Sequence, residues 1–355
     1  MTRTNASGTM VLILGAMLVA SAMLAGGCET NLAKPTIAVN LPDKYNTPDG
    51  MTVDAQNNII LSVPNINDPN HPAVILSISP DDKITEITKL PNHPETKRAI
   101  PLGVGVGSDG NLYVSDSQGF VTDDHKSRVL RVVMKDGKAQ KVEVVVTGLV
   151  MANGLAVRGD MIYVCDSKIE PKSYPVPSGV YGFKINELSA DKPYKVKPGL
   201  ADPHLAIHFT TKNKANQVGA NGLGFDNEGN MVVCNFGDAQ LIQGKMGADG
   251  KVVSQKIAAE GQGMLCCDGL SIDRKSGDVY IADFLGNALH RVNLKTGKVT
   301  TIAKNANTDG ADGSLDRPSE PCVRGSKVYV SNIDLPLAGN TFDKPHTLSV
   351  VEVGE

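Results

Sequence analysis

The sequence predicts an all-β protein, a six-bladed β-propeller, and two observations support this. One pattern recurs six times: an apolar strand of alternating side chains, a tight turn, and a second apolar strand ending in a small polar residue. The copies follow at intervals of 47 to 53 residues with one interval of 68, and hairpin repeats of roughly 40 to 50 residues are typical of propellers. The second position of the copies is occupied by Gly50, Gly103, Gly154, Gly222, Gly269 and Glu320.

The composition agrees with this fold and limits the partners. The chain has 355 residues, 41% of them hydrophobic, so it can bury a large core. Its 36 Gly and 20 Pro suit a protein rich in turns, and no strong helical period occurs outside the N-terminus. The formal net charge is −3 and no basic stripe with interleaved aromatic residues is present, so no nucleic-acid partner is expected.

The N-terminus predicts export. The apolar run Val11–Leu24 is too short for a comfortable membrane span and is followed by Ala25-Gly26-Gly27-Cys28. This resembles a bacterial lipobox, although Leu24 lies one position earlier than usual. We expect a lipoprotein-type signal peptide at 1–27 and a tether at 28–34, with the lipidated Cys28 anchoring the protein in the bacterial cell envelope, on the periplasmic side. Plain secretion with a free Cys28 thiol is the alternative.

Residues 35–355 are expected to form the propeller as one domain. The sixth copy begins near Ser319, and only three strands can be placed from there onward, whereas a blade needs four. The isolated strand Thr36–Leu41 is predicted to supply the missing outer strand of the last blade. Closing the ring in this way would remove open sheet edges.

The third and fourth strands of each blade are expected after each copy of the pattern. In the second blade they are predicted at Arg128–Val133 and Val142–Thr147, and in the fifth at Ala288–Leu294 and Val299–Ala303. The longest interval leaves a segment at Ile169–Gln217, which is predicted to be a loop excursion over one face.

The residue that opens each innermost strand is expected at one mouth of the central channel, where the six positions meet. Two of these residues are carboxylates and two are amides. Converging oxygens suit Ca²⁺, which takes about six to eight oxygen ligands, better than Zn²⁺, which prefers His and Cys. The alternative is that Asp and Asn only form turns before the strands. The six residues are Asp49, Leu102, Asn153, Asn221, Asp268 and Ser319.

The repeats also resemble those of a known family. The segments N-G-L-A-V at 153–157, N-G-L-G-F-D-N-E-G-N at 221–230 and D-G-L-S-I-D at 268–273 look like the gluconolactonase family, which includes regucalcin (senescence marker protein). The resemblance covers about Tyr45–Val353. It implies a six-bladed propeller that acts as a divalent-metal lactonase.

The resemblance further implies a metal site and a substrate contact. Asp49, Asn221 and Asp268 match the metal ligands of the family, and Asn153 matches a residue near the substrate. Two positions depart from the family pattern. Asp49 replaces a Glu that is longer by one methylene, and Met151 stands where sugar lactonases carry an Arg that could grip hydroxyls or a carboxylate. Met151 therefore implies a less polar substrate than an aldonolactone.

These residues predict a metal-dependent hydrolase of lactones or related esters, acting on a small molecule. A divalent cation would polarise the carbonyl and acidify a bound water, and Asp268 is the expected general base. Glu320 is a possible further carboxylate, but alignment without gaps puts Ser319 in the ring, and strand alternation then turns Glu320 away. The alternative function is a non-catalytic, NHL-like propeller that binds a ligand or protein partner at the cell envelope.

Other polar features leave alternatives open. Cys266 and Cys267 could form a strained vicinal disulfide or remain reduced thiols at the mouth. His204 and His208 could reach the mouth as a proton shuttle or be ordinary surface residues. The segment Asn305–Pro318 resembles the linker of NHL repeats and is not a calcium loop, because it lacks the alternating acidic ligands and terminal Glu of that motif.

Overall fold

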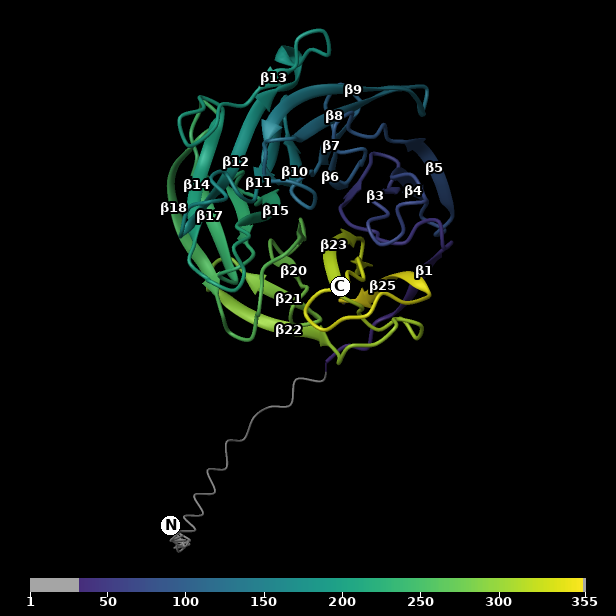
Figure 1. Ribbon diagram of the computed structural model, residues 1–355. Helices are drawn as coiled ribbons and strands as arrows, with labels where there is room; N and C mark the ends of the chain where they lie inside the picture. Colours follow the sequence, from purple (N-terminus) through teal and green to yellow (C-terminus); the bar gives the residue numbers. More distant parts are fainter. Residues whose placement is uncertain (1–31, 354–355) are drawn as a thin grey trace, which may run out of the picture. The chain divides into compact units, whose positions relative to one another are not determined.

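The computed structural model describes residues 32–353, which form six β-sheets placed as blades around a central axis (Figure 1). The predicted all-β, six-bladed propeller is confirmed. The described residues include one helical turn, the 3₁₀ helix η1 (Ile185–Glu187). Within 32–353, no helix has the length and apolar character that spanning a membrane requires. The predicted signal peptide at 1–27 and the lipidation site Cys28 lie outside the described residues.

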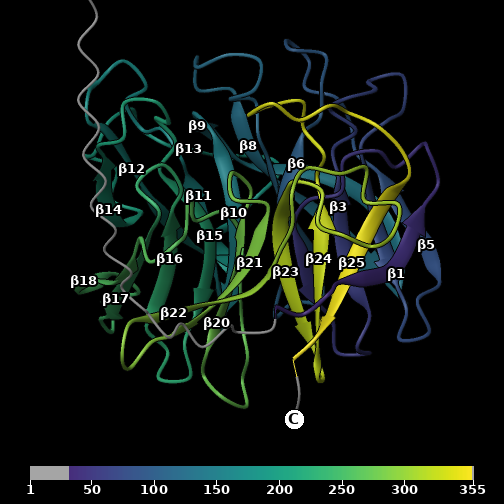
Figure 2. The ribbon, with the colours of Figure 1, turned by 90° about the horizontal axis from the view of Figure 1, so that it is seen from below.

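In the first, second, fourth and fifth blades the strands follow one another from the axis outward in chain order, each antiparallel to the last. Figure 2 shows inner strands such as β10 and β23 running along the axis, with loops at both ends. The first blade holds β2 (Met51–Val53), β3 (Ile59–Val63), β4 (Val74–Ile78) and β5 (Ile84–Lys89). The second holds β6 (Pro101–Val106), β7 (Leu112–Asp116), β8 (Ser127–Lys135) and β9 (Lys138–Leu149).

The fourth and fifth blades repeat this arrangement, and the third differs only by a short strand that joins its neighbour. The third blade holds β10 (Ala152–Arg158), β11 (Met161–Asp166), β12 (Val176–Lys184) and β14 (Leu205–Thr211), while β13 (Tyr194–Lys195) pairs with the edge of β9. The fourth holds β15 (Ala220–Phe225), β16 (Met231–Asn235), β17 (Gln240–Met246) and β18 (Val252–Glu260). The fifth holds β19 (Leu270–Ile272), β20 (Val279–Asp283), β21 (Ala288–Asn293) and β22 (Lys298–Lys304).

The sixth blade combines both ends of the described chain. Its strands, from the axis outward, are β23 (Pro318–Arg324), β24 (Lys327–Asn332), β25 (His346–Glu352) and β1 (Thr36–Leu41). β1 pairs antiparallel with β25, with Leu41 opposite His346. The outer strand of this blade therefore comes from the segment that precedes the first blade.

The prediction of a loop excursion at Ile169–Gln217 is wrong. This segment contains β12 and β14, the two outer strands of the third blade, and β13, which extends the second blade. The prolines of the segment suggested a loop. Pro177, however, lies before Gly179, where β12 begins to pair with β11, so the N–H group that proline lacks removes no hydrogen bond from that ladder.

The core lies between neighbouring blades. The second strands of the blades, such as β3, β7 and β16, are buried at every position because a sheet covers each of their faces. One cluster joins Val232 of the fourth blade to Ile281 and Val292 of the fifth. Such runs of apolar residues are expected of strands buried on both faces.

The six inner strands stand next to one another around the axis, and glycine allows this close approach. A Cβ at Gly222 would lie 2.6 Å from both the carbonyl oxygen of Asp268 and the amide nitrogen of Leu270. The same position of the other repeats is also packed against the next strand, and it carries a side chain only in the sixth blade, at Glu320. The repeated Gly is therefore required by packing.

Candidate functional site

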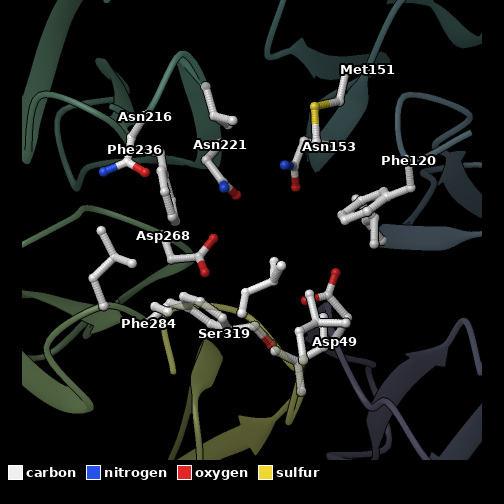
Figure 3. Close-up of a pocket in the computed structure, with 17 residues that line it drawn as sticks. Asp49, Phe120, Met151, Asn153, Asn216, Asn221, Phe236, Asp268, Phe284 and Ser319 are labelled. Atoms are coloured by element: carbon white, nitrogen blue, oxygen red, sulfur yellow. The ribbon is translucent and has the colours of Figure 1, made fainter. Parts of the chain in front are cut away.

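All six residues that open the inner strands line one cavity of about 380 Å³ at a mouth of the channel. We call Asp49, Leu102, Asn153, Asn221, Asp268 and Ser319 the ring residues. Figure 3 shows the side chains of Asp49, Asn153, Asn221 and Asp268 directed toward a common space, each from a different blade. The sequence-predicted candidates for metal and substrate binding are thus brought together.

The ring side chains are largely enclosed by protein. Asp49 and Asn153 are each 9% exposed, Asn221 is 7% exposed and Ser319 is 3% exposed. Asp268 is somewhat more open to the cavity. Oxygens that face a shared space from such enclosed positions have little bulk water to solvate them.

The electrostatics of the ring disfavour two free carboxylates. Burial raises the pKa of Asp49 to about 6, although contacts with the Ser319 side chain and the Gly50 backbone oppose the rise. Burial, and then the charge of Asp49, hold the pKa of Asp268 well above its usual range, while the Asn221 amide acts in the opposite direction. A positive charge between the two carboxylates would reverse these effects.

Polar residues at the ends of the second strands hold the ring in place. Asp166 accepts hydrogen bonds from the backbone N–H groups of Val150 (2.9 Å) and Met151 (2.8 Å), which precede Asn153 by three and two residues. Asp283 does the same for Leu265 and Cys266, and Asp116 and Asn332 accept one such bond each. These residues therefore fix the entry into the inner strands of the second, third, fifth and sixth blades.

Neighbouring polar groups also orient the amide of Asn153. Its Nδ2 donates to Ser167 Oγ at 3.3 Å, and that hydroxyl donates to the carbonyl of Ala220 at 2.6 Å. In Figure 3 the Asn153 oxygen points toward the shared space. Asn153 is therefore arranged to offer an acceptor to the cavity.

The register of β23 on β24 places Ser319 in the ring and Glu320 at the position of the repeated Gly. The Glu320 carboxylate lies against Gly269 and lines a separate cavity further along the channel, with Leu155 and Leu223. Burial, and then the charges of Asp49 and Asp268, hold its pKa well above the usual range. The ring acids thus raise the pKa of Glu320, although Glu320 does not line their cavity.

The walls of the cavity are mostly apolar, and sequence reasoning missed most of them. Phe236, Phe284 and Ile333 each follow the last residue of a second strand, so they occupy one repeat position in blades four to six. This shared position was a signal that could have identified them. Phe120 and Met151 lie on another side of the cavity (Figure 3). Other lining residues are Asn216, Val218, Leu285, Leu335, Leu337 and Ala338.

The remaining candidates lie elsewhere. Cys266 and Cys267 are free and fully buried, and neither lines the cavity; the Sγ of Cys267 lies 2.7 Å from the Sγ of Cys234 in the fourth blade. His204 packs on Phe183 at 4.9 Å between ring centroids, next to the outer strand of the third blade. These contacts assign His204 to packing.

The donors that face the cavity fit a hard divalent cation. Two carboxylates and two amide oxygens are the ligand types that Ca²⁺ accepts, with flexible geometry. The described residues lining this cavity include no Lys, Arg or His, so no protein cation offsets the two acids there.

No family model and no curated protein sequence matches the chain. Solved structures do match it. A luciferin-regenerating enzyme is 15% identical with a TM-score of 0.60, over 90% of this chain and 96% of that one. A gluconolactonase from Xanthomonas campestris is 15% identical with a TM-score of 0.54, over 90% and 96%. A PQQ-bound aldose sugar dehydrogenase from Streptomyces coelicolor is 16% identical with a TM-score of 0.55, over 89% and 96%. The chain therefore shares the propeller fold of gluconolactonases and sugar dehydrogenases.

Proposed function

We propose that this protein is a metal-dependent hydrolase of lactones or related esters. The observation that carries the proposal is the convergence of Asp49, Asn153, Asn221 and Asp268, from four blades, on one apolar-walled cavity. Asp49, Asn221 and Asp268 would hold the cation, for which Ca²⁺ is the best match. When bound, the cation would supply a Lewis acid beside the substrate carbonyl.

The residues of the cavity have separate roles in this proposal. Asp268 is the base that takes a proton from the attacking water, because its carboxylate points into the cavity and is more exposed there than Asp49. Asn153 orients the substrate through its amide. Met151, Phe120 and Phe236 bind the apolar part of the substrate and exclude bulk water from it.

The lining also indicates the class of substrate. A cavity with two acids and no described basic side chain would repel an anionic substrate and favour a neutral lactone or ester with apolar substituents. The same argument disfavours a role like that of the PQQ-bound dehydrogenase, because PQQ is a polycarboxylate. Met151, in place of a guanidinium, supports the same preference.

The test combines metal analysis with a substrate panel. Purified protein is expected to contain a divalent metal and to hydrolyse at least one neutral lactone or aryl ester, with loss of activity in chelator and recovery on adding Ca²⁺. Asp268→Asn should lower kcat by about 100-fold or more while the circular dichroism spectrum is unchanged. Asp312→Asn, at an exposed position outside the cavity, is the matched control.

Two outcomes would redirect the proposal. Tight metal binding without turnover on any lactone or ester would favour the non-catalytic binding propeller. Hydrolysis that persists in chelator and in Asp268→Asn would exclude the metal-dependent mechanism.

We also propose that the protein is exported and anchored through Cys28, on the strength of the small residues Ala25-Gly26-Gly27 that precede it. Replacement Cys28→Ala should move the protein from the membrane fraction to the soluble fraction of bacterial cells. Incorporation of labelled fatty acid into the wild-type chain but not the variant checks the chemistry, and equal partitioning of both would contradict it.

A further inference from the structure

A second group of carboxylates lies in the sixth blade, outside the ring residues. Asp316 precedes β23, Asp334 follows β24, and Asp343 lies in the connection from β24 to β25. One oxygen from each carboxylate lies within 4.8 Å of the other two. Asp316 and Asp334 are each only 3% exposed. Two buried carboxylates and a partly buried third repel one another at this distance when all are ionised, so a proton or a cation is needed between them.

Buried oxygens at this group have no partner in the described chain. Asp316 Oδ1 and Asp343 Oδ1 accept no hydrogen bond. Asn340, which is 8% exposed, donates from Nδ2 to Asp334 Oδ1 at 2.7 Å, and its own Oδ1 is buried without a partner. Buried polar atoms are nearly always satisfied. The unpartnered oxygens of Asp316 and Asp343 are therefore available to a proton or to a cation from outside the chain.

The nearest basic side chains of the described residues are engaged elsewhere. Arg317, next to Asp316 in sequence, donates to the carbonyls of Phe284 (3.2 Å) and Ala338 (2.9 Å). Lys344, next to Asp343, pairs with Asp43 at 2.5 Å. No ion pair between a described Lys, Arg or His and the three carboxylates is formed.

The charge distribution agrees with this geometry. Burial, and then the charges of Asp334 and Asp343, raise the pKa of Asp316 to about 8. Burial raises the pKa of Asp334 to about 6, and burial and then Asp309 raise that of Asp343. The neighbouring carboxylates thus add to the effect of burial, and a cation at this group would reverse their contribution.

We propose that Asp316, Asp334 and Asp343 bind a second hard divalent cation of the Ca²⁺ type, with the Asn340 amide as an additional oxygen donor. Carboxylate and amide oxygens are the ligands that Ca²⁺ prefers. The ligands come from two segments of the chain, Asp316 before β23 and the others between β24 and β25, so no single loop motif reveals the site in the sequence. The proposal stands on residues other than those of the central cavity.

The position of the cation site gives it a role. Asp334, Asn340 and Asp343 all belong to the connection 333–345, which crosses one end of the ring (Figure 2, yellow). Leu335 and Leu337 of the same connection line the central cavity. A cation that ties this connection to Asp316 would therefore fix a wall of the cavity without touching the substrate.

The test measures Ca²⁺ binding to the metal-free protein by calorimetry at neutral pH. A double variant, Asp49→Asn with Asp268→Asn, isolates the second site and is expected to bind one Ca²⁺. Adding Asp343→Asn should weaken that binding at least 10-fold, and this residue is the least buried of the three, so the variant should fold. Asp312→Asn, exposed in the segment before β23, should leave binding unchanged.

Hydrogen exchange gives an independent readout. Ca²⁺ should slow amide exchange in 333–345 of the double variant and should not do so after Asp343→Asn. The proposal is overturned if the double variant binds no Ca²⁺, or if Asp343→Asn binds as tightly as its parent. If the double variant instead binds as many ions as wild type, the central metal site fails while the second site stands.

Discussion

Met151 shows how one side chain can set the chemistry that the cavity accepts. It is 7% exposed and lines the cavity beside Asn153, and Asp166 fixes its backbone N–H. Its Cβ packs against Gly119, where a Cβ would lie only 2.6 Å away. The thioether therefore stands in a defined place and presents apolar surface to the site. A charged group at this position would change the preferred substrate without changing the ring.

Replacement of Met151 by Arg should shift the substrate preference toward anionic lactones. The ratio of kcat/KM for a carboxylate-bearing lactone to that for a neutral lactone should rise about 10-fold, which corresponds to about 1.4 kcal/mol, because a guanidinium binds carboxylate in a bidentate manner. Met151→Leu, which keeps volume and polarity, should leave the ratio unchanged. An equal fall for both lactones in Met151→Arg would show that the position does not select between them.

The sequence predicted the ring residues because they share one position in a repeat, so their convergence follows from the fold alone. Strand alternation also predicted that Glu320 turns away from the ring, but the sequence could not show that its side chain packs against Gly269 and lines a second cavity. It also missed the group Asp316, Asp334 and Asp343, whose members share no repeat position. Long-range contacts between loops leave no local pattern in a sequence.

Among the elements, strands of the second and fifth blades were well predicted and the outer strands of the third blade were not. Strands β8 and β21 begin within one residue of their predicted starts, because alternating apolar residues bounded by turn residues mark them clearly. The segment holding β12 and β14 is rich in proline and carries a short extra strand, β13, that belongs to another sheet. In this segment the strands are set by pairing with residues far away in the sequence, and the local strand propensity of the residues does not reveal that pairing.

The close contact of the inner strands predicts a sharp effect of Gly222→Ala. The new methyl group would meet backbone atoms of the fifth blade at 2.6 Å, and backbone cannot move aside cheaply. We expect a loss of about 2–4 kcal/mol in the free energy of unfolding, measured by denaturant titration. Glu320→Ala, at the same repeat position, is the matched control and should be neutral or stabilising, because the sixth blade already accommodates a Cβ there. Equal losses in both variants would contradict this account.

The hydrogen bonds that Asp166 accepts just before β10 lead us to expect a loss of both stability and activity in Asp166→Ala. The variant leaves the N–H groups of Val150 and Met151 unpaired in a buried setting, which should cost about 2–4 kcal/mol. Because these residues lead into Asn153, KM for the lactone should rise as well. Asp166→Asn retains one acceptor and should lose about half as much stability. An unchanged KM in Asp166→Ala would show that Asn153 is positioned by other contacts.

For the whole molecule, the buried acids make stability depend on both protons and cations. The pKa of Asp49 and of Asp334 is raised to about 6 and that of Asp316 to about 8, against 3.8 for an ordinary Asp. The folded state therefore binds protons more tightly than the unfolded chain. These groups contribute stability that is fully present below about pH 4 and is lost as pH rises through 6 to 8.

The melting temperature of the metal-free protein should therefore carry a component that falls between about pH 4 and pH 8, and Ca²⁺ should offset it. A cation takes the place of the protons, so the rise in melting temperature on adding Ca²⁺ should be small at pH 5 and large at pH 8. At 100 times its Kd, each bound ion would contribute about 2.7 kcal/mol. Calorimetry in chelator and in Ca²⁺ at each pH checks this. The difference between the two melting temperatures at one pH removes the effect of carboxylates that titrate but bind no ion. The double variant Asp49→Asn with Asp268→Asn should remove one part of the Ca²⁺ effect on the melting temperature, and Asp343→Asn should remove another part. A Ca²⁺ effect that does not change with pH would show that these acids do not bind the ion.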